Sequence, residues 1–281
     1  MAGTAVCYHP PVRTALVLLL VLVSVPRAFA ASPAEALALA RKLYNQGQYD
    51  KALEAVRDAE GTAATASSAR LVIGRILLER YRQTAQGSDL HGARVALRGL
   101  DTRVLDEKER VELQVGLAEV LFFDDRFGAA AELLDPVLES SPTLGPEAHD
   151  RAVDWWASSL DRYAQAQPAG DRAPVYERLV QRMEEELRRE AGSTPASYWL
   201  VAAARGAGDL ERAWAAAAAA WVRAVLARDR GATLRADLDR LVTQALIPDR
   251  ATRIAPRDRH EAIVSMTSEW EEFKSTWMRS E

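Results

Sequence analysis

The stretch from Glu35 to Glu60, EALALARKLYNQGQYDKALEAVRDAE, constrains the fold more than any other part of the chain. It reads as two amphipathic helices joined by a tight turn at residues 45–48. Gly47 ends the first helix without the steric cost of a Cβ atom, and Ala52 lets the second helix approach closely. A helical hairpin of this kind cannot bury its apolar face alone. The sequence therefore predicts an array of stacked helical hairpins.

The hairpin pattern recurs along the chain with different residues. Its anchor alanines are separated by 41, 37 and 83 residues: Ala52, Ala93, Ala130 and Ala213. The last gap leaves room for one extra hairpin, made of residues 146–166 and 172–190 and split by a break at residues 168–170. The second unit is expected to have a longer connection around residues 83–91. Alternating β-branched runs do not occur, so the predicted class is all-α.

These residues resemble the tetratricopeptide repeat (TPR) family, whose unit is a helix–turn–helix of 34 residues. The sequence GDLERAW at 208–214 mirrors GQYDKAL at 47–53, and the resemblance covers roughly residues 34 to 228. It implies a TPR-like α-solenoid of antiparallel hairpins over residues 31–230. The first unit carries it most clearly, on Leu39, Ala40, Leu43, Gly47, Tyr49, Ala52, Val56 and Ala59.

In that family, the first helix of each hairpin lines a concave surface that binds extended peptides. The resemblance therefore implies a protein or peptide partner on the corresponding residues of this chain. The Lys and Asn set with which some members clamp a C-terminal carboxylate is not present. The arginines suit an acidic partner, or they are ordinary solvated side chains. The implied partner-binding residues are Leu37, Arg41, Tyr44, Leu71, Arg75, Leu78, Glu119, Phe122, Tyr198 and Arg205.

After residue 230 the pattern changes, and residues 231–281 are predicted to form a C-terminal helical extension. One amphipathic helix is expected to end at Pro248, followed by a polar link over residues 249–256. The last helix carries an apolar seam at alternating intervals of three and four residues. This seam is expected either to cap the array or to dock on a partner. Its residues are Ile263, Met266, Trp270, Phe273 and Trp277.

Residues 1–30 have the three parts of an export signal. Arg13 precedes an apolar run of 11 residues, 15–25, and Ala28-Phe29-Ala30 gives a cleavage site after Ala30. The run is shorter than the roughly 20 residues of a membrane-spanning helix. The alternative to a cleaved signal is an uncleaved membrane anchor. The sole cysteine, Cys7, lies inside the signal. The mature chain is therefore expected in an oxidising compartment, either periplasmic or secreted, without an integral membrane span.

The charge and the motifs argue against several functional classes. The formal net charge is −4. A chain with a net negative charge has no overall electrostatic attraction to nucleic acid. The histidines outside the signal, His91, His149 and His260, lie in no metal-ligand spacing, and neither a nucleophile elbow nor a phosphate-binding loop is present. We therefore expect no metal, no cofactor and no catalytic residues.

Trp155 and Trp156 are adjacent, so they point about 100° apart on a helix, and one of them is expected to reach a groove or a seam between repeats. The favoured function is a non-catalytic interaction scaffold of the bacterial cell envelope. One alternative is an enzyme or enzyme subunit with a site near His149 and these tryptophans. Another is a peripheral subunit of an envelope complex that docks by its C-terminal helix. The oligomeric state stays open.

Overall fold

The computed structural model describes residues 32–140 and 145–278, and these two ranges contain helices, turns and no strand. The all-α prediction is confirmed. The predicted signal at residues 1–30 lies outside the described residues. Within the described ranges, no helix combines the length and the apolarity that crossing a membrane requires.

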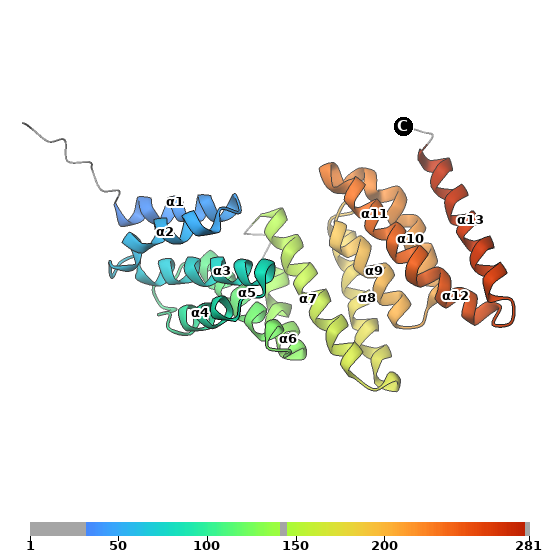
Figure 1. Ribbon diagram of the computed structural model, residues 1–281, viewed down its shortest axis with the longest axis horizontal. Coiled ribbons are helices and arrows are strands. Elements are labelled where there is room, and N and C mark those ends of the chain that lie inside the picture. The colour runs from blue at the N-terminus through green and yellow to red at the C-terminus, as the bar shows by residue number, and fades with distance from the viewer. Residues whose placement is uncertain (1–31, 141–144, 279–281) are drawn as a thin grey trace, which may run out of the picture. The chain divides into compact units, whose positions relative to one another are not determined.

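The helices follow one another in chain order (Figure 1). They are α1 (Pro33–Asn45), α2 (Tyr49–Glu60), α3 (Ala66–Thr84), α4 (Gly87–Arg98), α5 (Glu107–Phe123), α6 (Phe127–Ser140), α7 (Pro146–Ala166), α8 (Arg172–Arg189), α9 (Thr194–Gly206), α10 (Leu210–Arg223), α11 (Gly231–Leu241), α12 (Ile247–Ile254) and α13 (Arg259–Met278). Short 3₁₀ segments η2 (Ala169–Asp171) and η3 (Ala224–Arg230) and the π-helical turn η4 (Val242–Leu246) connect some of them.

Neighbouring helices pack against each other along the chain, with α1 on α2, α3 on α4, α5 on α6 and α9 on α10. The first helices of successive hairpins also lie beside one another, in the order α1, α3, α5, α7, α9 and α11. The architecture is therefore a helical repeat-like array. Because the first helices are neighbours, their side chains share one face of the array.

Three of the hairpin turns have the same backbone geometry. Gly47, Asp125 and Gly208 occupy the left-handed region, with φ of 70°, 56° and 80°. In each turn the next residue donates its N–H to the carbonyl oxygen five residues back, over 2.9 to 3.0 Å. This is the Schellman ending of a helix. The three turns belong to the units whose sequences match the repeat pattern best.

The anchor alanines lie where two helices cross. Ala52, Ala93, Ala130 and Ala213 are all fully buried. The second hairpin corrects one expectation: α3 continues to residue 84 and α4 begins at residue 87, so the long connection predicted at 83–91 is wrong. A left-handed Ala85, φ 55°, reverses the chain within two residues.

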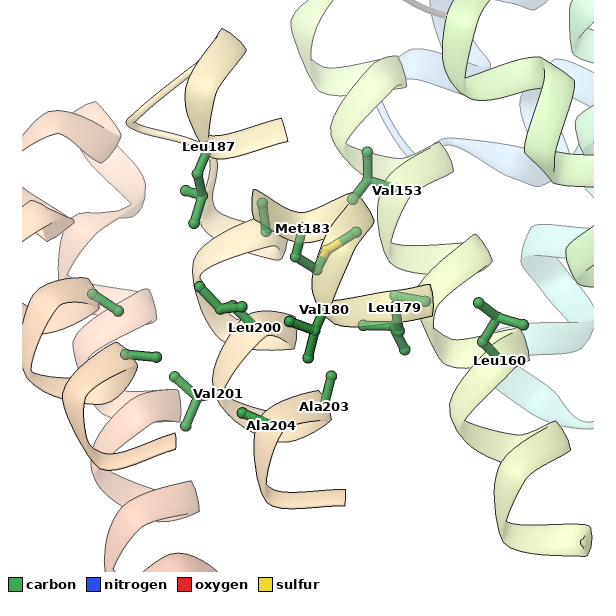
Figure 2. Close-up of a cluster of buried hydrophobic side chains, with 14 of the residues drawn as sticks. Val153, Leu160, Leu179, Val180, Met183, Leu187, Leu200, Val201, Ala203 and Ala204 are labelled. Atoms are coloured by element: carbon green, nitrogen blue, oxygen red, sulfur yellow. The ribbon is translucent and has the colours of Figure 1, made fainter. Parts of the chain in front are cut away.

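The extra hairpin predicted between the third and last units is present, and it contributes to the largest core. α7 and α8 are separated by the expected break at residues 168–170. Figure 2 shows side chains of α7, α8 and α9 packing together in this core. Leu160 and Leu179 come from α7 and α8, and Val201 comes from α9; all three are buried. Smaller cores join α1 to α3 and α3 to α5.

The prediction that a helix ends at Pro248 is wrong, because the helical path continues from residue 231 to residue 254. Proline lacks the N–H for an ordinary helical bond and its ring clashes with the preceding turn. Here the π-helical turn η4 precedes it, and Ile247 donates to the carbonyl oxygen of Val242, five residues back. The wider turn makes room for the ring, so the connection to α13 is only residues 255–258.

Candidate functional site

A cavity of about 240 Å³, here called the N-terminal cavity, lies among α1, α3, α5 and α7. Four residues predicted to bind a partner line it together, namely Arg41, Tyr44, Arg75 and Glu119. They come from three different first helices, so the packing of hairpins brings them together rather than their positions in the sequence. The other lining residues are Asn45, Val72, Lys108, Glu112, Val115, Ala148, Arg151 and Ala152.

Ion pairs between helices fix two of the cavity's arginines. Arg41 on α1 contacts Glu109 at 2.8 Å and Glu112 at 3.0 Å, both on α5. Arg75 on α3 lies 2.7 Å from Glu119 on α5. Burial raises the pKa of Glu119, although the positive charge of Arg75 opposes that rise. The pairs tie the first three hairpins together along this face.

Two further cations of the same cavity were missed at the sequence level. Lys108 on α5 and Arg151 on α7 line it, both are exposed, and neither has an ion pair or a hydrogen bond among the described residues. Arg151 is close enough to act on the pKa values of both Tyr44 and Glu119. The repeat pattern does not show which side of α7 faces this surface, so the sequence alone did not predict that Arg151 lies on it.

A larger groove of about 850 Å³, here called the C-terminal groove, continues the face over α7, α9 and α11. Tyr198, a predicted partner-binding residue on α9, lines it together with Pro195, Leu234 and Leu241. Arg151 lines both this groove and the N-terminal cavity. The two hollows therefore form one surface, here called the first-helix face.

The charged residues of the C-terminal groove are mostly paired. Asp150 on α7 forms an ion pair with Arg230, the last residue of η3, and Arg240 contacts Asp237 at 3.3 Å within α11. Asp154 accepts a hydrogen bond from the indole N–H of Trp199 over 2.7 Å. The groove thus has an apolar floor and a nearly neutral polar border, unlike the cation-rich N-terminal cavity.

The remaining predicted partner-binding residues lie elsewhere. Leu71 and Leu78 are 0% and 1% exposed, so they belong to the core between α3, α4 and α5 and offer no surface to a partner. Leu37 packs partly buried on the first core. Phe122 lies edge-on to Trp155, with ring centroids 5.0 Å apart. Arg205 is held by Asp249 at 2.7 Å.

The residues of the predicted enzyme alternative do not converge on one cavity. His149 lies 2.9 Å from Glu186 and lines a hollow of about 310 Å³ beside the α8–α9 connection. Trp156 is buried in the core, while Trp155 packs between repeats against Phe122. The two tryptophans point apart, as the helical geometry predicts, and neither lines the hollow that contains His149.

The C-terminal seam packs on the end of the array. Trp270 is 1% exposed, its ring contacts those of Trp214 and Trp221, and its indole N–H donates to Asp239 over 2.9 Å. Ile263, Met266 and Phe273 pack partly buried on the same core, whereas Trp277 is 45% exposed. The helix α13 thus covers α10 and α12 with one side of its surface.

Comparison with known proteins returns no match: no family model fits the chain, and no curated protein or solved structure is significantly similar to it. The described residues also contain no cluster of three or more His, Cys, Asp and Glu side chains suited to a metal ion.

Proposed function

We propose that this protein is a non-catalytic scaffold of the bacterial cell envelope that holds a protein or peptide partner on its first-helix face. The observation that carries the proposal is the continuity of that face. Arg151 borders both the N-terminal cavity and the C-terminal groove, so a single extended ligand would cross six first helices in succession. An extended chain spans about 3.3 Å per residue, which suits a surface built from adjacent helices.

The chemistry of the face supports a peptide more than a compact substrate. Tyr198 and Leu241 offer apolar contacts to side chains, while Arg151 and Gln244 offer hydrogen bonds. Interfaces of this kind combine a few aromatic or arginine anchors with a polar border. The C-terminal groove is large enough to accept anchor side chains of the partner.

The finer assignment to a TPR-like repeat is part of the same proposal. The Schellman turns at Gly47, Asp125 and Gly208 and the buried alanines five residues after each turn support it. Export follows from the three-part pattern of residues 1–30, with cleavage after Ala30 and release to the periplasm or outside. N-terminal sequencing of the exported form should begin at Ala31, whereas an intact N-terminus in washed membranes would support an anchor instead.

A pull-down from envelope extract tests the scaffold proposal if the bait is varied by position. Tyr198→Arg places a charge in the C-terminal groove and should abolish capture of the partner. Tyr163→Arg is the matched control, because Tyr163 on α7 is 38% exposed and lines neither hollow of the first-helix face. Equal capture by both variants and the wild type would contradict the assigned face.

A further inference from the structure

The N-terminal cavity carries an excess of positive charge. Its lining contains four cations and two carboxylates, and each carboxylate already has an arginine partner. Lys108 and Arg151 are the uncompensated cations, and they face the cavity from α5 and α7. Two positive charges beside a partly enclosed hollow attract an anion.

The groups around these two cations suit an oxygen-rich ligand. The hydroxyl of Tyr44 has no hydrogen-bond partner within the described part of the chain, and it shares the cavity with Arg151. A guanidinium presents several N–H donors in a planar fork that matches a carboxylate or a phosphate. Lys108 adds an ammonium donor. The cavity thus offers three donor groups that no residue in the described ranges 32–140 and 145–278 uses.

The size of the cavity limits the ligand. Its volume of about 240 Å³ lies below the ~300 Å³ at which pockets for drug-sized ligands begin. The apolar part of the lining comes from Val72, Val115, Ala148 and Ala152. The cavity therefore suits a compact anion rather than a large ligand.

We propose that the N-terminal cavity is a binding site for a small anion, a carboxylate or a phosphate, held by Lys108, Arg151 and Tyr44. The site goes beyond the scaffold proposal and does not depend on it, because the cavity's own lining supplies every group that would hold the anion. The buried ion pair of Arg75 and Glu119 forms part of its wall, and these two residues neutralise each other, which leaves Lys108 and Arg151 for the anion.

Isothermal titration calorimetry of the purified protein tests the site with three probes: succinate, citrate and inorganic phosphate. Ionic strength is held constant with sodium chloride, because screening alters every charge interaction. At least one probe should bind with one-to-one stoichiometry, and the comparison distinguishes a carboxylate from a phosphate ligand. Arg151→Gln and Lys108→Gln should each weaken that binding about ten-fold, as expected for the loss of one charge-assisted hydrogen bond.

Two matched variants separate a built site from general attraction to positive charge. Arg188→Gln on α8 and Lys42→Gln on α1 remove the same charges from exposed side chains that do not line the cavity. They should leave the affinity unchanged. The proposal is overturned if no probe binds up to millimolar concentration, or if the control variants weaken binding as much as Arg151→Gln and Lys108→Gln do.

Discussion

The guanidinium of Arg75 on α3 lies 2.7 Å from the carboxylate of Glu119 on α5, and solvent reaches only 12% and 2% of these side chains. The pair joins the second hairpin to the third at the wall of the N-terminal cavity. Removing one member of a buried ion pair leaves the other charge unbalanced in a poorly hydrated site, which costs more than the pair itself contributes.

Glu119→Ala should therefore lower the free energy of unfolding by about 3–5 kcal/mol, measured by urea denaturation. The control is Asp101→Ala, which breaks the solvent-exposed pair with Arg103 and should leave the urea midpoint nearly unchanged. A similarly small effect of Glu119→Ala would show that water or a rearranged side chain compensates Arg75.

A second prediction concerns the crossing of α5 and α6 at Ala130, which is fully buried. Ala130→Phe inserts a ring where two helices meet and should cost about 1–3 kcal/mol of stability through overpacking. Ala129→Phe introduces the same ring at the exposed neighbouring position and should melt like the wild type. If thermal unfolding does not separate the two variants, the register of this repeat is wrong.

A third prediction concerns the docking of α13. Trp270→Ala should lower stability by about 3–5 kcal/mol, because it opens a cavity beside Trp214 and Trp221. Trp277→Ala removes a ring that is 45% exposed and should cost much less. Chemical denaturation followed by tryptophan fluorescence measures both effects.

Deletion of residues 257–281 distinguishes the two roles predicted for this helix. A cap is needed to cover the apolar end of the array, so the truncated protein should melt earlier and bind a hydrophobic dye. An unchanged melting temperature together with loss of a co-purifying partner would instead make α13 the docking element.

A fourth prediction concerns acid stability. Although burial acts to raise it, the pKa of Glu186 is lowered overall from its ordinary 4.5 by its contacts with His149, Arg182 and Arg189. A carboxyl with a depressed folded pKa stabilises the fold above its unfolded pKa, and this stabilisation is lost as the pH falls through the folded value. Stability should therefore decline below about pH 4.5.

Glu186→Gln should flatten that decline, because it removes the carboxyl whose protonation differs between the two states. Glu185→Gln changes an exposed neighbour in the same helix and should leave the slope unchanged. Melting temperatures measured from pH 6 down to about pH 3 test the pair. Identical slopes for Glu186→Gln and the wild type would contradict the role given to Glu186.

The hairpins were predictable because their signals are local. Gly47 and Gly208 mark left-handed turns directly, and even Asp125 belongs to a residue type that tolerates this conformation. In these three hairpins the buried alanine follows the left-handed residue by five positions. The recurring pattern of helix, turn and small residue was therefore enough to predict the fold class and the extra hairpin. The rotation of about 100° per helical residue was enough to predict that Trp155 and Trp156 point apart.

The site was predictable only in part because it depends on packing between distant segments. Arg41, Tyr44, Arg75 and Glu119 were placed on one face by the repeat register, and they do share a cavity. The same register put Leu71 and Leu78 on that face, but the long helix α3 buries both. Arg151 was missed, since its place follows from how α7 packs rather than from any motif. The π-helical turn before Pro248 likewise has no local sequence signal.

The most direct test of the scaffold account is site-specific photo-crosslinking in living cells. A benzophenone side chain at position 198 or 244, both lining the C-terminal groove, should give a discrete cross-linked partner. The same side chain at position 163 or 188, which line neither hollow, should not. Cross-links to the same partner from 163 and 188 but not from 198 and 244 would contradict the assignment of the first-helix face.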